Sequence, residues 1–204
     1  VSYAFVLFGS GGRQEQTLWS DQDNGLIYQD PPADIALEAE TYFRCLGDEI
    51  VEGLILLGYP PCEGNVLCRN PMWRTALSNW KETVHRWIAE PTWENARYAL
   101  IFADIRCVYG DESLARQLKQ AFFADLAGNR ASLGNLLNNT LHRKVSMGIF
   151  GQLIPERYGE DAGGFDVKYG SYIPLVNGIR FLALESGCME TSTLERIESL
   201  LRDQ

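Results

Sequence analysis

Apolar residues in the first part of the chain come in short runs that alternate with polar, glycine-rich segments. The run of residues 4–8 leads directly into glycines, and a second run, residues 24–28, is followed by a pair of prolines. Short apolar runs bounded by glycine and proline are typical of buried strands. We therefore predict two strands in the first 30 residues, with a tight glycine turn after the first.

Further along, apolar residues recur every three or four positions, which is the period of a helix. The first such stretch extends from about residue 35 to residue 57, with apolar positions Ile35, Ala39, Tyr42, Leu46, Ile50 and Leu54. Asp34 precedes it, where a side-chain oxygen can cap the first turn, and Gly58 follows it. The pattern predicts one long helix after the second strand.

A second helical stretch is predicted to begin at Asn70-Pro71, because a capping side chain followed by proline is a favourable helix start. It carries a stripe of large apolar residues, namely Trp73, Leu77, Trp80, Val84 and Trp87. Tryptophans in such a stripe can stack on a cofactor, but packing in the core is the commoner use of this spacing. We therefore assign the tryptophans to the core.

The last part of the chain is predicted to be helical. Thr92 is placed to cap a short helix, and the apolar run of residues 101–109 indicates a buried strand. From about Ser113 onward the pattern is that of helices, with breaks near Gly128, residues 159–164 and Gly187. We therefore predict a domain of strands and helices over residues 1–112, joined without a flexible linker to an all-helical domain over residues 113–204.

Charge and composition limit the classes of partner. The chain has 204 residues and a net charge of −9, which allows one large domain or two small ones. No basic stripe is visible, so a nucleic acid is not expected as a partner. The acidic balance suits a site that recruits metal cations to a phosphate ligand, although solubility accounts for it equally well.

The cysteines and histidines do not predict a zinc site. The five cysteines form no Cys-x-x-Cys pair, and there are two histidines. An odd number of scattered cysteines is typical of reduced thiols in a cytoplasmic protein. No apolar run approaches the ~20 residues needed to span a membrane, and no signal peptide is visible. The chain starts inside an apolar stretch without an initiator methionine, so we expect a further region upstream.

The segment from Gly9 to Asp23 carries residue types suited to phosphate chemistry. A Gly-Ser turn after a strand can offer backbone N–H groups and a hydroxyl to phosphate oxygens. Asp21 and Asp23 are two positions apart, and on a strand such residues point to the same face. Both carboxylates can therefore converge on one cation, and Mg²⁺ prefers such oxygen ligands together with substrate phosphates.

Each of these features alone has a simpler interpretation. A Gly-Ser pair is usually only a turn, and an Asp-x-Asp pair is more often a solvated surface than a metal site. The segment also lacks the Gly-Lys-Ser/Thr of a Walker A loop and the spacing of a dinucleotide-binding motif. The specific feature is the order: strand, Gly9-Ser10, ten intervening residues, then Asp21-x-Asp23 leading into a second strand.

This order resembles the signature of the polymerase-β-like nucleotidyltransferases. The stretch Gly9-Ser10-x-Gly12-Arg13-x-Glu15, with Ser20-Asp21-x-Asp23, is most similar to the uridylyltransferases that modify the nitrogen-signalling protein PII. A later stretch, Asp104-x-Arg106-x-x-x-Gly110-Asp111, resembles a second segment of those enzymes. One departure is visible, because Gln22 and Asn24 are polar where the superfamily usually has hydrophobic residues.

Over nearly its full length the chain resembles a bacterial family described as putative nucleotidyltransferases, often fused to CBS or cyclic-nucleotide-binding modules. Further matching stretches are residues 69–74, 166–168 and 174–176. The resemblance implies an α+β fold: a polymerase-β-like nucleotidyltransferase domain, with a small mixed sheet and flanking helices, followed by an all-α helical substrate-binding domain.

The resemblance also implies a set of metal ligands. Asp21 and Asp23 would hold Mg²⁺ or Mn²⁺. Asp104 would be the third carboxylate, both a metal ligand and a catalytic group aligned with the attacking hydroxyl. The alternative for Asp104 is a salt bridge to Arg106.

Other residues are expected to contact the nucleotide. Gly9 and Ser10 would hold the β- and γ-phosphates, with Ser20 beside them, and Lys168 would close over the nucleotide or the acceptor. Arg13 is expected either to bind phosphate or to pair with Glu15. Two further arginines, Arg69 and Arg74, are expected either to reach the triphosphate or, by default, to lie on the solvated surface.

The implied activity is transfer of a nucleoside monophosphate from a nucleoside triphosphate to a hydroxyl. A signalling protein is the candidate acceptor, and upstream regulatory domains are expected as further partners. Neither a nucleic acid nor a membrane is expected. The alternative from another class is a regulatory module that binds a nucleotide without chemistry, and a weaker one is a helical scaffold for protein partners. The presence of all three carboxylates favours the enzyme.

Overall fold

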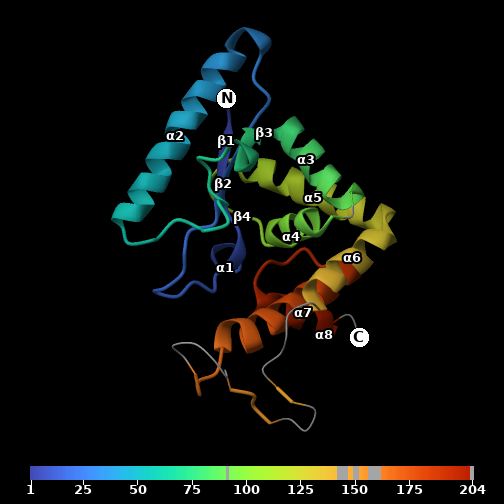
Figure 1. The fold of residues 1–204 in the computed structure, drawn as a ribbon. Helices are drawn as coiled ribbons and strands as arrows, with labels where there is room; N and C mark the ends of the chain where they lie inside the picture. The colour runs from blue at the N-terminus through green and yellow to red at the C-terminus, as the bar shows by residue number, and fades with distance from the viewer. Residues whose placement is uncertain (91, 142–146, 149–151, 156–161, 203–204) are drawn as a thin grey trace.

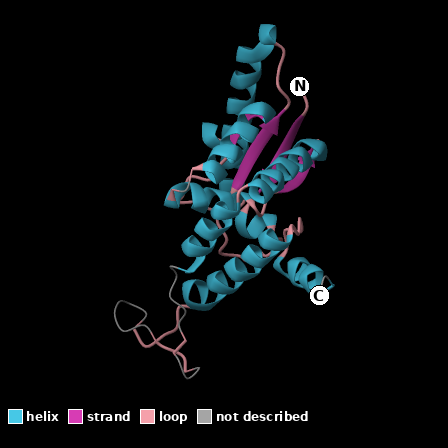
Figure 2. Cartoon of the chain, turned by 90° about the vertical axis from the view of Figure 1, so that its right-hand side faces the viewer, coloured by secondary structure: helices cyan, strands magenta, loops and turns pink. Residues whose placement is uncertain are grey.

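The computed structural model describes the chain except for residues 91, 142–146, 149–151, 156–161 and 203–204. Within the described part, the strands lie in the upper half of the molecule among helices, and the lower half consists of helices and loops (Figure 2). Half of the predicted break at residues 159–164, namely residues 159–161, lies outside the described residues, and residues 162–164 form a turn and a bend. The break at Gly187 is confirmed, because this residue ends a helix in the left-handed conformation, with φ +74°.

Four strands form one mixed sheet in the order β3-β2-β1-β4. The bounds are β1 Tyr3–Leu7, β2 Asn24–Tyr28, β3 Arg74–Ala76 and β4 Arg106–Gly110. Strand β1 is central and runs antiparallel to both β2 and β4, whereas β3 pairs parallel to β2 at the edge. The two strands predicted in the first 30 residues are therefore confirmed as the middle of the sheet.

Helices cover both faces of this sheet (Figure 1). Alternate side chains of β1 point to opposite faces. Ala4 and Val6 pack with helices α3, α4 and α5, whereas Tyr3 and Phe5 pack on the side of α2. The bounds of these helices are α2 Ala36–Leu56, α3 Leu77–Ala89, α4 Trp93–Phe102 and α5 Glu112–Gly128.

A group of helices follows, and the described residues of this stretch form no further strand of the sheet. Its bounds are α6 Arg130–Leu141, the short π-helical turn η3 Lys168–Tyr172, α7 Ile173–Ser186 and α8 Thr193–Arg202. The α+β fold class is confirmed. The predicted boundary at residue 112, however, separates α5 from the sheet that it covers, because Leu114, Leu118 and Phe122 belong to the same core cluster as Val6 and Phe8.

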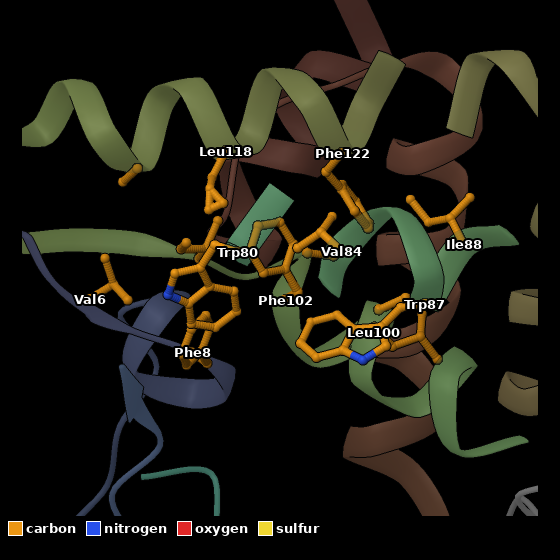
Figure 3. Packing of buried hydrophobic residues seen from close by; sticks show 14 of the residues in the cluster. Val6, Phe8, Trp80, Val84, Trp87, Ile88, Leu100, Phe102, Leu118 and Phe122 are labelled. Carbon is orange, nitrogen blue, oxygen red and sulfur yellow. The ribbon is translucent and has the colours of Figure 1, made fainter. Parts of the chain in front are cut away.

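The tryptophan stripe lies in the core, as expected. Trp73 and Trp80 are fully buried and Trp87 nearly so. Figure 3 shows Trp80 among Phe8 and Phe102, with Trp87 further along the same helix. The Trp80 indole also donates a hydrogen bond to the carbonyl oxygen of Leu26 at 3.0 Å, so its polar atom is satisfied inside the core.

The long helix α2 was predicted correctly. Its cap was not, and its stripe was predicted only in part, with Ala39, Leu46 and Ile50 packed as expected. Asp34 lies in a short 3₁₀ turn, η1 Ala33–Ile35, and its side chain makes no capping hydrogen bond to α2. The buried positions are Ala39, Phe43, Gly47 and Val51, while Tyr42 is 58% exposed. Gly47 determines which side of α2 packs against the loop of Cys68, because a Cβ at position 47 would lie 2.5 Å from the carbonyl oxygen of Cys68.

The second predicted helix starts later than expected. Asn70 does cap a turn, since its side-chain oxygen accepts from the N–H of Met72 at 3.0 Å. That turn is the single 3₁₀ turn η2 Pro71–Trp73, and α3 begins only at Leu77. The intervening residues form β3, because they pair with β2, a tertiary contact that local spacing does not encode.

The strand predicted over residues 101–109 is shorter than expected. Thr92 caps α4 as predicted, accepting from the N–H of Asn95 at 3.1 Å, but the helix continues to Phe102. The strand itself begins at Arg106, and Asp104 lies in the turn between the two elements. Short apolar runs fit either a helix or a strand, and here the first part packs with helical spacing through Ala99 and Phe102.

No helix in the described ranges is both long enough and apolar enough to cross a membrane.

Candidate functional site

A large pocket of about 1220 Å³ lies between the sheet end and the helical group. Three segments line it: the loop after β1, helix α4, and the stretch from η3 into α7. The lining residues that bear on the chemistry are Gly9, Ser10, Arg13, Ser20, Asp21, Asp23, Trp93, Arg97, Asp104, Lys168, Tyr172 and Arg180. Apart from Arg69 and Arg74, every residue of the predicted site therefore borders this one pocket.

Asp21 and Asp23 come together at one corner of the pocket. They flank Gln22, which forms a parallel bridge with Pro61, so this segment is extended. One ligand atom from each of Asp21, Asp23 and Cys62 lies within 4.8 Å of the others. We call these three residues the acidic corner. Among the described residues, this is the group that could hold a metal ion, and Cys62 was not predicted to belong to it.

The polar residues that depart from the superfamily pattern hold this corner in place. Gln22 donates to the carbonyl oxygens of Val51 and Tyr59, at 3.4 and 3.2 Å. Asn24 donates to Gln22 at 3.0 Å and accepts from the N–H of Cys68 at 2.8 Å. Both side chains are buried with their hydrogen bonds made. They fasten the segment of Asp21 and Asp23 to the loop that carries Cys62.

The acidic corner carries unfavourable negative charge. The pKa of Asp23 is raised to about 6, chiefly by burial and also by the neighbouring charge of Asp21, while a hydrogen bond with Cys62 acts in the opposite direction. Burial and the charge of Asp23 raise the pKa of the Cys62 thiol to about 12. A cation at this position would relieve the repulsion between the carboxylates, so the donor set fits an oxygen-seeking divalent ion.

The glycines of the motif make room for the carboxylate residues. Gly9 and Gly12 begin and end a short helix, α1 Gly9–Gly12, where a turn was expected. Gly9 has φ +52°, and a Cβ there would lie 2.5 Å from Oδ2 of Asp23. A Cβ on Gly12 would collide with the backbone oxygen of Asp104. Both glycines therefore permit close approach of the backbone to the site.

Asp104 does not lie with the other two carboxylates. It is fully buried, and each of its oxygens is held by guanidinium groups. Arg13 bonds Oδ2 at 2.6 Å, Arg180 bonds Oδ1 at 3.0 Å and Oδ2 at 2.5 Å, and Arg196 bonds Oδ1 at 2.9 Å. The metal-ligand and catalytic role expected for Asp104 therefore does not fit this arrangement.

The alternative expected for Asp104, a salt bridge to Arg106, does not form either. Arg106 donates instead to the carbonyl oxygens of Gly12 and Gly11, at 3.1 and 2.8 Å. Burial alone would raise the pKa of Asp104, but Arg180, Arg196 and Arg13 outweigh it and lower that pKa. Asp104 therefore stays charged, and its ion pairs hold α7 and α8 in place.

Arg13, which bonds Asp104, also makes hydrogen bonds to two other side chains of the protein. Its Nε donates to Glu15 at 2.8 Å, and its Nη2 donates to the Tyr172 hydroxyl at 3.0 Å. Tyr172 donates in turn to Glu15 at 2.7 Å, and Glu15 accepts from the N–H of Thr193 at 2.9 Å. The expected Arg13–Glu15 pair is therefore present, and all three guanidinium nitrogens of Arg13 have partners within the protein.

The remaining predicted residues divide between the pocket and other places. Ser20 borders the pocket, and its hydroxyl accepts from the N–H of Thr17 at 2.9 Å. Lys168 borders it from the helical side. Arg69 and Arg74 do not border it. Arg69 pairs with Glu52 at 2.5 Å, and Arg74 is buried, donating to the carbonyl oxygens of Cys68 and Arg69.

Several residues of the site were not predicted. Arg180 and Arg196 could have been noticed, because Arg180 falls on the same helical stripe as Val176, Ala183 and Leu184. An arginine on the apolar face of a helix often signals a buried ion pair. No local signal marked Cys62 or Arg97, since the place of Cys62 beside Asp21 and Asp23, and that of Arg97 in the pocket, depend on how distant segments pack.

Cationic side chains also line the pocket, in addition to the carboxylates of the acidic corner. The chain carries a net charge of −9, yet Arg13, Arg97, Lys168 and Arg180 all border this pocket. A pocket with carboxylates at one corner and cations along its wall suits a ligand that is itself an anion and is accompanied by a metal ion.

Two family models match the chain. The one described as "Putative nucleotidyltransferase DUF294" matches residues 1–94, and the one described as "Putative nucleotidyltransferase substrate binding domain" matches residues 130–204. No curated protein and no solved structure matches the chain. The pocket takes its lining from both matched regions and from α4, most of which lies between them.

Proposed function

The chain belongs to the DUF294 family of putative nucleotidyltransferases, and from this premise we propose that it transfers a nucleoside monophosphate from a nucleoside triphosphate to a hydroxyl acceptor. The observation that carries the proposal is the acidic corner, Asp21, Asp23 and Cys62, whose two carboxylate residues border a pocket that arginines and a lysine also line. Phosphoryl transfer needs little covalent chemistry from the protein, but it needs metal ligands and positive charge around the phosphates.

Asp21 and Asp23 hold a Mg²⁺ or Mn²⁺ ion in this proposal. When bound, the ion neutralises phosphate charge and aligns the attacking and leaving oxygens. The chain supplies the rest: Gly9 and Ser10 border the pocket beside Asp23 and offer backbone and hydroxyl donors to the phosphates. Cys62 shares a hydrogen bond with Asp23 and so helps to orient its carboxylate.

The transfer itself is a displacement at the α-phosphorus. The acceptor oxygen forms a bond to this phosphorus as the bond from it to the β-phosphate oxygen breaks. The electron pair leaves with pyrophosphate, and the proton of the acceptor hydroxyl passes to solvent. Lys168, at the helical side of the pocket, closes over the nucleotide or the acceptor. The acceptor class that we propose is a protein hydroxyl, by resemblance to the uridylyltransferases that modify PII.

The test is transfer of label. The protein is incubated with each labelled nucleoside triphosphate, with Mg²⁺ or Mn²⁺, and with cell lysate as the source of acceptor. We expect metal-dependent labelling that falls at least a hundredfold in Asp21→Asn and in Asp23→Asn, because a lost metal ligand removes several kcal/mol of charge stabilisation. Asp34→Asn is the matched control, since Asp34 is exposed and does not border the pocket.

A second candidate is a regulatory module that binds a nucleotide without transferring it. It is favoured by one observation, the commitment of Asp104 to three arginines, which leaves two carboxylates at the acidic corner instead of the three expected. The same experiment separates the two. Metal-dependent binding of a nucleotide, with no label transferred under any condition, supports the module and contradicts the transferase.

A further inference from the structure

Arg97, on α4, is a half-buried arginine that borders the pocket. Within the described part of the chain, its guanidinium has neither a hydrogen bond nor an ion pair. Its recorded contact is with the face of Tyr98, 5.8 Å from the ring centre. The neighbouring arginines differ, because Arg13 and Arg180 give their donors to Asp104 and its surroundings.

The face of α4 that carries Arg97 is directed at the pocket. Trp93, Arg97, Leu100 and Ile101 all border it, and their spacing places them on one side of a helix. The rest of the helix is anchored in the core through Ala96, Ala99 and Phe102. Arg97 is therefore held on a rigid element, with its charge toward the cavity.

Arg97 also lies beside the acidic corner. Its Nη2 is 2.5 Å, and the Cys62 sulfur 3.5 Å, from the position that a Cβ on Gly64 would take. The two atoms are therefore no more than about 6 Å apart (2.5 Å plus 3.5 Å). The Cys62 sulfur is in turn within 4.8 Å of a carboxylate oxygen of Asp21 and of Asp23.

The guanidinium of Arg97 carries five N–H donors and lies next to the acidic corner. This arrangement suits an anion that contacts both the guanidinium and a metal ion at the corner. An ion at Asp21 and Asp23 would hold phosphate oxygens about 2 Å away, and the other oxygens of a triphosphate would extend toward the guanidinium. Arginine binds phosphate through two parallel hydrogen bonds, which a lysine cannot reproduce. Gly64 contributes by leaving space for the guanidinium, because any side chain there would meet it.

We propose that Arg97 binds the β- and γ-phosphates of the nucleoside triphosphate whose metal ion is held by Asp21 and Asp23. The proposal rests on the proposed function for the identity of the substrate. It adds a residue that bears on the leaving pyrophosphate, on which negative charge develops as the α–β bond breaks. Arg97 thus takes the phosphate-binding role that was one of the two expected for Arg13. Arg13 cannot take it, because its guanidinium is bonded to Glu15, Asp104 and Tyr172.

The test measures binding in the whole chain by titration calorimetry, with inorganic tripolyphosphate, nucleoside triphosphates and nucleosides as ligands, in the presence of Mg²⁺. In Arg97→Gln we expect the affinity for tripolyphosphate and for the triphosphate to fall about ten- to hundredfold, as for loss of a charged hydrogen-bonding partner. Nucleoside binding should stay unchanged, and Arg97→Lys should recover part of the loss. Thermal unfolding should be unchanged too, because Arg97 has no polar partner among the described residues to lose.

Arg86→Gln is the matched control, since Arg86 is exposed on α3 and does not border the pocket. Tripolyphosphate binding that is as tight in Arg97→Gln as in the parent, or equally weakened in Arg86→Gln, would overturn the assignment. Failure of the parent to bind any triphosphate would overturn both this assignment and the proposed function. Arg97-dependent binding with no transfer of label would overturn the transferase alone.

Discussion

Gly9 shows how one residue without a side chain shapes the acidic corner. Its positive φ starts α1 at the end of β1, and its missing Cβ leaves room for the Asp23 carboxylate. Phe8, next to it, donates its N–H to the Asp23 carbonyl at 3.0 Å. The backbone of Asp23 is therefore hydrogen-bonded to the residue before Gly9, and the carboxylate of Asp23 packs against Gly9 itself.

Gly9→Ala should consequently disturb both stability and the site. The new methyl group would meet Asp23 and would sit in a strained backbone region, so we expect a loss of about 1–3 kcal/mol in the free energy of unfolding. Metal-dependent binding of a triphosphate should weaken as well. Urea denaturation and calorimetry measure the two effects. In Gly134→Ala, where a Cβ meets nothing within 4 Å, neither should appear. An unaltered Gly9→Ala protein would contradict this account of the corner.

At the scale of elements, α2 is positioned by its close approach to the loop that carries Cys62 and Cys68. The helix offers Gly47 at this contact, and Cys68 donates its thiol to the Gly47 carbonyl at 3.5 Å. The same loop accepts a hydrogen bond from Gln22 at the carbonyl oxygen of Tyr59 and donates one from the N–H of Cys68 to Asn24. The packing of α2 thereby bears on the acidic corner, although α2 contributes no residue to the pocket lining.

Two glycines of α2 should respond to alanine in opposite directions. In Gly47→Ala the methyl group would lie 2.5 Å from a backbone oxygen, so we expect destabilisation by about 1–3 kcal/mol. In Gly53→Ala nothing lies within 4 Å, so the higher helix propensity of alanine should stabilise by about 0.5–1 kcal/mol. Chemical denaturation of the two variants gives the comparison. Equal effects would show that propensity, not contact, governs this helix.

At the scale of the whole molecule, one buried carboxylate holds the helical group against the sheet domain. Asp104 accepts hydrogen bonds from Arg180 of α7 and Arg196 of α8. Arg196 also donates to the carbonyl oxygen of Ala103 at 2.9 Å. Glu15 adds a second link between the two parts, because it accepts hydrogen bonds from the Tyr172 hydroxyl and from the N–H of Thr193. The pocket between the two parts therefore has its width set by ion pairs that water does not reach.

Replacing Asp104 should loosen this junction. Asp104→Asn leaves three arginines around a neutral group, and breaking a buried ion pair in this way costs about 3–5 kcal/mol of stability. Asp48→Asn is a suitable control, because Asp48 is exposed and lies 3.7 Å from Arg69. That variant should stay within about 0.5 kcal/mol of the parent. Denaturation midpoints measure both, and an Asp104→Asn protein of parental stability would contradict the anchoring role.

The same carboxylate predicts how stability depends on pH. Its pKa is lower in the folded chain than its ordinary value of 3.8, so the folded state binds the proton less readily than the unfolded one. The stability contributed by Asp104 is therefore complete above about pH 4 and is lost as pH falls through the folded pKa. Acid unfolding followed by circular dichroism should show this loss in the parent, and Asp104→Asn should lack it.

Much of the fold could be predicted because local spacing carries it. The strands at residues 3–7 and 24–28, the long helix α2 and the buried tryptophans all follow from short runs or helical periods. The errors occurred where one local pattern admits two structures. The run at residues 101–109 divides between a helix and a strand, and the start at Asn70 gives only one turn because β3 pairs with β2.

The sequence by itself determined that Asp21 and Asp23 share one face, close after a glycine turn, because residues two apart on an extended chain point the same way. Tertiary structure alone decided what surrounds them. It brought Cys62 and Arg97 to the acidic corner, and it gave Asp104 to arginines that are 76 and 92 positions away along the chain. The reason is physical: contacts across such separations depend on how two packed units meet, and no local spacing records that.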